Sequence, residues 1–285
     1  MTTPTQPTGA PPPGSASTPP TQGDSAPDGA VAAALFSLTG RLALVTGASG
    51  VLGAHFARVL HGAGAAVVLA ARRVDALARL VAELGAERAI AVPLDVTDPA
   101  SIVAACDAAE ARFGRPCDVI VNNAGVAVTK PVLQQTAEDW DAVLDVNLRG
   151  CFLVAQEAAR RLVAAKRPGA IVNIASVLGE RVIAGVAGYT AAKAGLIHLT
   201  RQLAVELARY GIRANVLAPG YVATPLNAEF FASEAGQAMV RRIPQRRLGR
   251  PEDLTGPLLL LASEAGAHMT GAVLTVDGGH SVNPL

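Results

Sequence analysis

Short apolar runs alternate with longer Ala-rich stretches from residue 38 onward, and this alternation constrains the fold more than any other feature. Each run is continuously apolar, as expected for strands that helices bury on both faces. The predicted strands lie at 42–46, 66–70, 89–94, 119–122, 170–175, 213–217 and 273–276. The predicted helices lie at 53–63, 75–84, 99–113, 138–166, 189–210 and 252–264. Strands that alternate with helices in this way predict right-handed crossovers and a doubly wound parallel sheet.

The first thirty residues have a different composition, with eight of the 19 prolines and little that could be buried. Ordering such a segment costs conformational entropy that apolar burial cannot offset. We therefore expect residues 1–34 to be a disordered tail and residues 35–285 to form one folded domain. The tail is either a docking segment for a partner or an extension without a selected role, and its composition favours the second reading.

Charge and cysteine content exclude several classes of protein. A net charge of +1 does not supply the field that binds a phosphate backbone, so we expect no nucleic-acid partner. The three cysteines lack metal or disulfide spacing, and the five histidines lack paired spacing, so we expect neither a metal site nor an oxidising compartment. The apolar runs are too short to span a bilayer. We expect a cytoplasmic protein without a membrane partner.

A glycine-rich turn follows the first predicted strand and precedes a predicted helix. The turn reads Gly47-Ala48-Ser49-Gly50-Val51-Leu52-Gly53. A strand, a tight turn and a helix N-terminus together present backbone N–H groups to an anion, most often the pyrophosphate of a dinucleotide. The alternative is a turn that only lets the helix pack closely on the strand.

The second predicted strand ends in Arg72-Arg73, where an NAD-binding protein carries an acidic residue for the ribose 2′-hydroxyl. Arginine at this place can instead pair with the 2′-phosphate of NADP. The pair therefore favours NADP, with NAD as the alternative cofactor. Two solvated arginines at a helix start would look the same in sequence.

Ser176 follows a predicted strand, and Tyr189 and Lys193 stand four residues apart on a predicted helix. Four residues is about one helical turn, so the phenol and the ammonium project from one face. A cation beside a phenol favours the phenolate, which makes tyrosine usable as a general acid and base. The alternative is an unconnected tyrosine and lysine on an amphipathic helix.

The same chain also contains, in order, Asn122-Asn123-Ala124-Gly125, Asn147 and Pro219-Gly220. With all of these motifs, the chain resembles a short-chain dehydrogenase/reductase over about residues 36–281. The likeness is greatest to members resembling 3-oxoacyl-acyl-carrier-protein reductase and to the sugar-acid reductases near them. The resemblance implies a single Rossmann-like domain with a seven-stranded parallel sheet and helices on both faces, commonly assembled as a homotetramer.

The resemblance also implies roles for individual residues. Tyr189 would exchange a proton with the substrate oxygen, Ser176 would hydrogen-bond that oxygen, Lys193 would hold the nicotinamide ribose, and Asn147 would position a relay water. The implied cofactor-binding residues are Gly47, Ser49, Gly50, Leu52, Gly53, Arg72, Arg73, Asp95, Val96, Asn123, Ala124, Gly125, Tyr189, Lys193, Pro219, Gly220, Val222 and Thr224.

One position departs from the family pattern Thr-Gly-x-x-x-Gly-x-Gly, because Val51 stands where the middle glycine is expected. A branched side chain at a point of close cofactor approach predicts weaker cofactor binding.

The implied activity is hydride transfer between NADP(H) and a small ketone or hydroxy compound. The alternatives are reduction of a 3-oxoacyl carrier protein or of a sugar acid, and, in another class, a catalytically silent NADP-sensing protein. The basic segment at 241–247 is compatible with an anionic substrate. The favoured interpretation is a cluster of arginines that are solvated or lie between subunits. Carrier docking would use Arg161 and a second basic position that holds Val205 here.

Overall fold

The computed structural model describes residues 28–225 and 227–283. By its internal contacts the chain divides into two units, Met1–Ala34 and Leu35–Leu285. Most of the predicted tail lies outside the described residues. At the end of the predicted tail, Asp28–Phe36 forms helix α1, which the sequence analysis did not predict. Its Ala-rich sequence has high helix propensity, which the proline content of the preceding residues obscured.

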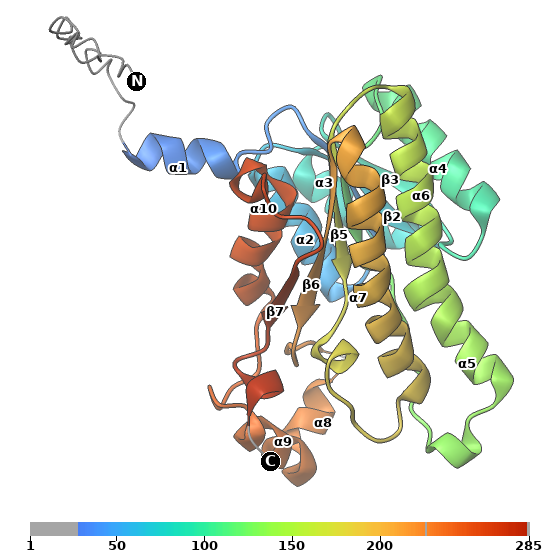
Figure 1. The fold of residues 1–285 in the computed structure, drawn as a ribbon, viewed down its shortest axis with the longest axis vertical. Helices are drawn as coiled ribbons and strands as arrows, with labels where there is room; N and C mark the ends of the chain where they lie inside the picture. The colour runs from blue at the N-terminus through green and yellow to red at the C-terminus, as the bar shows by residue number, and fades with distance from the viewer. Residues whose placement is uncertain (1–27, 226, 284–285) are drawn as a thin grey trace, which may run out of the picture. The chain divides into compact units, whose positions relative to one another are not determined.

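The second unit contains a seven-stranded parallel sheet with the order β3-β2-β1-β4-β5-β6-β7 (Figure 1). The predicted strands are all present, with ends that move by one or two residues. Their bounds are β1 Leu42–Thr46, β2 Ala66–Ala71, β3 Ala89–Pro93, β4 Val119–Asn122, β5 Gly169–Ile174, β6 Ile212–Pro219 and β7 Val273–Val276. The predicted doubly wound fold is confirmed.

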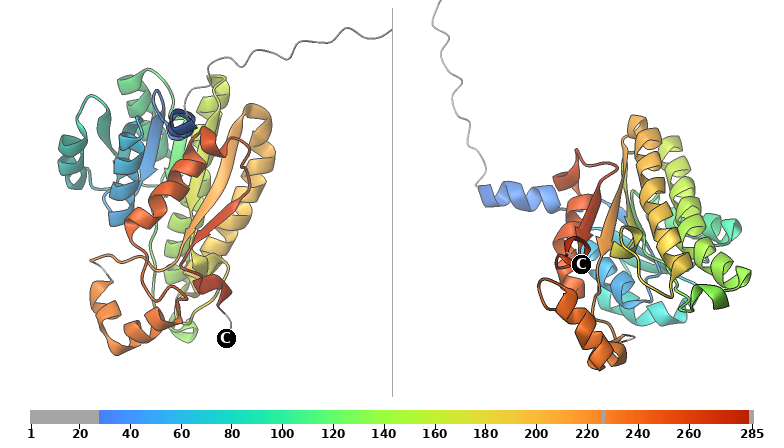
Figure 2. Two further views of the ribbon diagram at one scale, coloured as in Figure 1. Left: turned by 90° about the vertical axis from the view of Figure 1, so that its left-hand side faces the viewer. Right: turned by 60° about the horizontal axis from the view of Figure 1, so that its bottom comes forward.

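Helices cover both faces of the sheet, as Figure 2 shows from two further directions. One hydrophobic core joins the sheet to α2 (Val51–Gly62), α3 (Ala78–Leu84) and α10 (Thr255–Ala262). The other joins it to α4 (Pro99–Phe113), α6 (Gly150–Ala164) and the end of α7 (Ala187–Leu207). Burial on both sides explains why the strands read as continuous apolar runs.

The predicted helix at 138–166 is two helices separated by a π-helical turn. Helix α5 covers Ala137–Leu144, the turn covers Asp145–Arg149, and α6 follows it. Two short helices, α8 (Ala228–Ala232) and α9 (Glu234–Arg242), were not predicted. The side chain of Ser233 accepts a hydrogen bond from the Gly236 N–H at 3.2 Å and caps α9.

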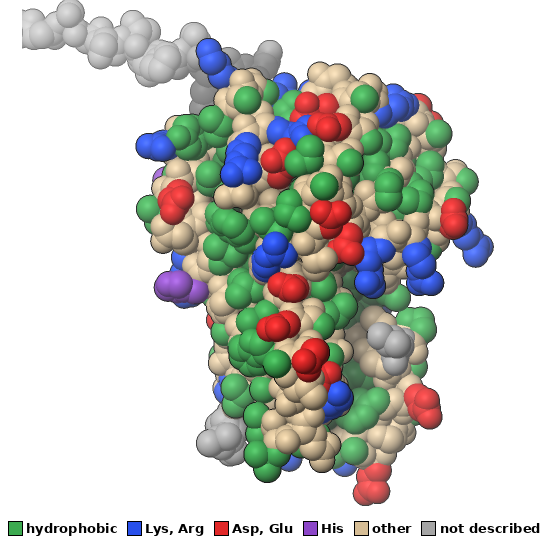
Figure 3. Space-filling model, turned by 90° about the vertical axis from the view of Figure 1, so that its right-hand side faces the viewer, with side chains coloured by type: hydrophobic (Ala, Val, Ile, Leu, Met, Phe, Trp, Pro, Cys, Tyr) green, Lys and Arg blue, Asp and Glu red, His purple; other side chains and the backbone are tan. Residues whose placement is uncertain are grey.

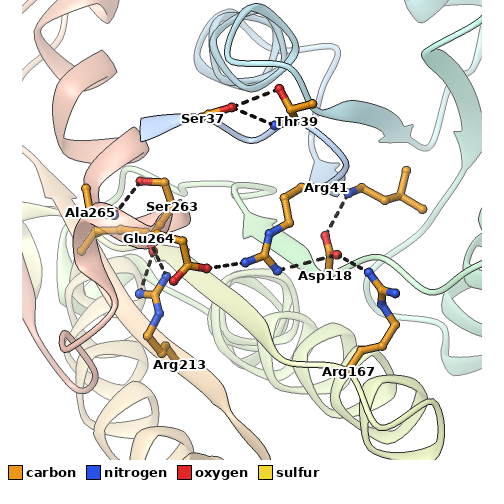
Figure 4. A network of polar contacts seen from close by, with 11 residues as sticks. Ser37, Thr39, Arg41, Asp118, Arg167, Arg213, Ser263, Glu264 and Ala265 are labelled. Carbon is orange, nitrogen blue, oxygen red and sulfur yellow. Dashed lines mark hydrogen bonds and ion pairs between the residues drawn. The ribbon is translucent and has the colours of Figure 1, made fainter. Parts of the chain in front are cut away.

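A polar network secures the edge of the sheet where the strands begin (Figure 4). Asp118 is fully buried at the start of β4, and its Oδ1 accepts a hydrogen bond from the Leu42 N–H at 2.8 Å. Its Oδ2 lies 3.2 Å from Arg167 Nη2 and 3.8 Å from Arg41 Nη1. Arg41 also pairs with Glu264. The network ties β1 and β4 together at the edge opposite the strands' carboxyl ends.

Candidate active site

The carboxyl ends of the strands border a cleft of about 970 Å³. Strand β1 lies between β2 and β4. The connection from β1 to β2 therefore runs toward one edge strand, and the connection from β4 to β5 runs toward the other. This reversal opens a crevice at the carboxyl edge, where ligands of open α/β sheets bind. All the predicted site residues except Arg73 line this one cleft.

The glycine-rich turn packs against the segment that follows β4. A Cβ atom at Gly47 would lie 2.9 Å from Ala124 Cα, and one at Gly53 would overlap the carbonyl oxygen of Gly47. Gly47 also has φ +64°, a conformation that favours glycine. These two positions therefore need glycine for close backbone packing.

Helix α2 begins at Val51, and its N-cap residue Gly50 provides no side-chain hydrogen bond. The first N–H groups of the helix thus remain available at the wall of the cleft, where Ser49, Gly50 and Leu52 also lie. Val51 is 43% exposed and lines the same wall. Val51, the residue that differs from the family pattern, therefore lies where a bound anion would approach.

Thr46 joins the two glycine-containing segments, a role that the sequence reasoning missed. Its Oγ1 accepts hydrogen bonds from the N–H groups of Asn123 and Ala124, both at 3.0 Å. Asn123 Nδ2 donates back to the carbonyl oxygen of Thr46 at 3.0 Å. The sequence signals were the threonine that opens the family pattern and its position at the end of β1, directly before Gly47.

The two arginines after β2 differ in position. Both are exposed, but only Arg72 lines the cleft, together with Asp95 and Val96 from the segment after β3. The pKa of Asp95 is lowered, first by a hydrogen bond from the Thr97 N–H, then by one from its hydroxyl, and less by the charge of Arg72. Asp95 is therefore a carboxylate at this end of the cleft.

Ser176, Tyr189 and Lys193 meet in the cleft beside the carboxyl end of β5. Ser176 follows β5, and its Oγ accepts a hydrogen bond from the Leu178 N–H at 3.1 Å. Lys193 Nζ lies 5.6 Å from the centroid of the Tyr189 ring, as expected for residues one turn apart on α7. Lys193 is buried and donates to the carbonyl oxygen of Ile174 at 2.8 Å. That bond uses one of its three donors.

The π-helical turn places Asn147 against the segment after β4. Asn147 Nδ2 donates to the carbonyl oxygens of Val126 at 2.7 Å and Val143 at 2.9 Å. A Cβ atom at Gly125 would lie 2.7 Å from Asn147 Oδ1 and 3.8 Å from Lys193 Nζ. Gly125 therefore lies close to both the amide of Asn147 and the ammonium of Lys193, and any larger residue would displace the Asn147 amide.

Beyond β6, the segment with Pro219, Gly220, Val222 and Thr224 completes the cleft. The Asn227 side chain fixes this segment, since it accepts from the Thr224 N–H and donates to the Val222 carbonyl oxygen, both at 2.9 Å. Tyr221 also lines the cleft, although it was not predicted as a site residue. Burial raises the pKa of Tyr221, and the nearby Tyr189 contributes less.

In the part of the chain that the structure describes, no group of three or more His, Cys, Asp or Glu side chains is placed to hold a metal ion. Over the same residues, every helix is too short or too polar to cross a membrane.

Comparison with known proteins identifies relatives along nearly the whole second unit. Residues 47–281 match a family model described as enoyl-(acyl carrier protein) reductase. The chain is 43% identical to the cis-4-hydroxycyclohexanecarboxylate dehydrogenase of Sinomonas cyclohexanicum, over 85% of this chain and 96% of the relative. It is 38% identical to the gluconate 5-dehydrogenase of Gluconobacter oxydans, over 87% and 98%.

Solved structures agree with these matches. A gluconate 5-dehydrogenase from Burkholderia cenocepacia, in complex with NADP and tartrate, superposes with a TM-score of 0.83 at 39% identity, over 88% of this chain and 99% of that one. A short-chain type dehydrogenase/reductase from Mycobacterium marinum gives 0.81 at 38% identity, over 86% and 97%. The predicted resemblance is confirmed, and the chain belongs to the short-chain dehydrogenase/reductase family of oxidoreductases.

Proposed function

We propose that this protein is an NADP(H)-dependent oxidoreductase that interconverts a small ketone and the corresponding secondary alcohol. The observation that carries the proposal is the meeting of Ser176, Tyr189 and Lys193, from two separate segments, on one wall of the cleft that the glycine-rich turn borders. A nucleotide on that turn and a carbonyl group at these side chains would share one cavity.

The residues of the cleft fit NADP. Close packing at Gly47 and Gly53 fixes the turn that leads into α2, and the N–H groups at the start of this helix can bind a pyrophosphate beside Val51. Arg72 stands at the end of β2, where a guanidinium can pair with a 2′-phosphate. When bound, NADP(H) supplies or accepts the hydride. The complex of NADP with the Burkholderia gluconate 5-dehydrogenase supports the same choice of cofactor here.

Nucleotide contacts would spread over three further segments of the lining. Asp95 and Val96 would contact the adenine, and the Asn123-Ala124-Gly125 segment would pass the adenosine ribose. The Pro219–Thr224 segment would hold the nicotinamide carboxamide.

Tyr189 is the general acid and base in this proposal. During reduction, the phenolic O–H donates its proton to the carbonyl oxygen while the carbonyl carbon receives the hydride, and oxidation of the alcohol reverses both transfers. The Ser176 hydroxyl donates a second hydrogen bond to that oxygen and stabilises its developing negative charge.

Lys193 and Asn147 support this proton transfer. The two donors of Lys193 not used by Ile174 would hold the nicotinamide ribose hydroxyls beside Tyr189. Asn147, next to Lys193 across Gly125, would position a water that returns a proton from solvent.

The structure weighs against reduction of a carrier-bound acyl group. Arg161, the one basic position retained for carrier docking, pairs with Asp107 at 2.8 Å, Glu110 at 3.0 Å and Glu157 at 2.7 Å. A guanidinium with three carboxylate partners has little capacity left for the phosphate or carboxylates of a carrier protein.

The proposal is tested by following NADPH oxidation with a panel of ketones, diketones, 3-oxoesters and keto-sugars. We expect turnover of at least one class, and we expect Tyr189→Phe to lower kcat by about a thousandfold or more while NADPH still binds. Tyr210→Phe removes the same hydroxyl from an exposed site outside the cleft, so it should retain wild-type kcat. If Tyr189→Phe keeps more than about a tenth of the turnover, Tyr189 is not the proton donor.

A further inference from the structure

The cleft beyond the Ser176 and Tyr189 hydroxyls is walled mainly by apolar side chains. These come from the segments that follow β4 and β5 and that precede α7, and they are Val126, Ala127, Val177, Leu178 and Val186. Tyr221 adds an aromatic ring, which packs against Phe231 with 5.6 Å between ring centroids. A substrate whose oxygen reaches Tyr189 must place the rest of its body against this surface.

Positive charge on the described lining of the cleft is confined to Arg72 and Lys193. Arg72 follows β2 and acts on Asp95, at the end assigned to the nucleotide. Lys193 is buried and held by the carbonyl oxygen of Ile174. The lining acids Asp95 and Asp145 carry the same charge as a substrate carboxylate would. Neither cation lies in the apolar segments.

Basic side chains close in sequence to the apolar segments are engaged elsewhere. Lys130 Nζ binds both carboxylate oxygens of Asp139, at 2.8 and 2.6 Å. Arg181 donates to the carbonyl oxygen of Ser281 at 2.6 Å. In the basic segment 241–247, Arg247 pairs with Asp253 at 2.6 Å, and none of its arginines lines the cleft. Among the residues at 28–225 and 227–283, the apolar segments therefore offer an anionic substrate no free cation.

We propose, building on the proposed function, that the substrate is an uncharged secondary alcohol or ketone with an apolar ring or branched body, and that the cleft discriminates against sugar acids. Burial of an apolar ring against these side chains is favourable. Burial of a carboxylate there removes its hydration without an ion pair in return, which is costly. Discrimination arises because charged compounds lose solvation that the walls cannot replace.

Two ring ketones that differ in one group test this inference directly with the wild-type enzyme. The probes are 4-methylcyclohexanone and 4-oxocyclohexanecarboxylate, each reduced with NADPH, and D-gluconate oxidised with NADP⁺ serves as the sugar-acid probe. We expect kcat/KM to be at least about 100-fold higher for the methyl ketone than for the carboxylate. Equal values, a preference for the carboxylate, or turnover of gluconate alone would overturn the substrate class and leave the proposed function intact.

Failure of every compound, including the whole panel named above, would overturn both proposals. The two proposals can therefore fail separately. The proposed function requires turnover of at least one carbonyl compound, whereas the proposed substrate class requires a higher kcat/KM for the methyl ketone than for the carboxylate.

A pair of lysine variants tests the cause of the discrimination. Val186→Lys introduces a cation at the apolar wall, and we expect it to narrow the methyl-to-carboxylate ratio of kcat/KM by about tenfold or more. Val182→Lys is the matched control, since Val182 is 88% exposed in the same loop and does not line the cleft. Its ratio should stay within about twofold of wild type. An unchanged ratio in a folded Val186→Lys protein would show that charge at this wall does not set specificity.

Discussion

Adjacent residues at the end of β2 differ in whether they can reach a bound nucleotide, because Arg72 lines the cleft and Arg73 does not. We expect Arg72→Ala to raise KM for NADPH by about tenfold or more and to leave KM for NADH nearly unchanged. Only NADPH carries the 2′-phosphate, and a charge-assisted hydrogen bond is worth about 1.5–3 kcal/mol. Steady-state kinetics with both cofactors measures the difference.

Arg73→Ala is the matched control for that measurement, since it removes the same charge one residue away. It should change neither KM by more than about twofold, because Arg73 lies outside the cleft and solvent screens its charge from a bound nucleotide. Equal effects of the two substitutions, or equal effects of Arg72→Ala on both cofactors, would exclude Arg72 as the partner of the 2′-phosphate.

Val51 places a branched side chain at the first residue of α2, beside the N–H groups that face the cleft. We expect Val51→Gly to tighten NADPH binding by about 1 kcal/mol or more, comparable to restoring one hydrogen bond. The same change loosens the start of the helix and lowers stability by up to about 1 kcal/mol. NADPH fluorescence titration and Tm measurements separate the two effects.

Val51→Ala distinguishes side-chain bulk from backbone freedom, because alanine removes the branched carbons and keeps high helix propensity. If the bulk of the valine side chain weakens NADPH binding, Val51→Ala should recover most of the gain in NADPH affinity without the loss in Tm. If neither variant binds NADPH more tightly, the turn with Gly50 before Val51 is a working alternative geometry.

At the scale of single elements, the strands could be predicted because a strand buried on both faces consists almost entirely of apolar residues. The run at 119–122 is an example: Val119, Ile120, Val121 and Asn122 are all buried, and the predicted ends match β4. That the candidate site residues next to the strands share one cleft could also be predicted, because parallel strands bring their carboxyl ends to one edge of the sheet.

The π-helical turn at Asp145–Arg149 could not be predicted, because its cause lies elsewhere in the sequence. Asn147 donates to Val126, a residue on the loop after β4, and Gly150 packs against Val96. Such tertiary contacts decide the local helix type, and the hydrophobic periodicity within the segment does not indicate them. The exclusion of Arg73 from the cleft likewise depends on backbone direction after β2.

The ion-pair network at the amino edge of the sheet is an element-level device for stability. We expect Asp118→Ala to lower the free energy of unfolding by about 3 kcal/mol. It leaves the Leu42 N–H without its acceptor and removes the carboxylate that faces Arg167 and Arg41. Urea denaturation measures this difference, and kcat of the folded variant should remain unchanged because the network lies at the other edge of the sheet.

Asp107→Ala provides the comparison, since Asp107 also pairs with an arginine but its side chain is 64% exposed. We expect a loss below about 1 kcal/mol for this exposed pair. A similar loss for both variants would show that burial of Asp118 is not what makes its network stabilising.

At the scale of the whole second unit, the proposed catalytic site and the Asp118 ion-pair network lie at opposite ends of the same sheet. The carboxyl edge carries glycines, polar side chains and an open cleft, while the amino edge carries Asp118 and its arginines (Figure 4). Substitutions at one edge should therefore change activity or stability separately, because sites far apart without shared partners act additively.

The side of the molecule that carries α4, α5 and α6 has features of an interface between copies of the chain. Figure 3 shows apolar side chains gathered there between acidic and basic ones. Phe152 on α6 and Val103 on α4 are large apolar side chains that remain partly exposed. Arg161 on α6 pairs with Asp107 and Glu110 on α4, which holds the two helices together as one surface. Apolar surface of this kind often marks an association site.

We expect the protein to be a homotetramer in solution, with a light-scattering mass four times that of the 28.9 kDa chain. Phe152→Glu should lower that mass, because a carboxylate would have to be buried without a partner when two copies meet. Leu133→Glu is the control, since Leu133 is the more exposed side chain and lies outside α4 and α6. A wild-type mass equal to one chain at micromolar concentration would contradict the assembly, and a Phe152→Glu mass equal to that of the wild-type tetramer would place the interface on another face.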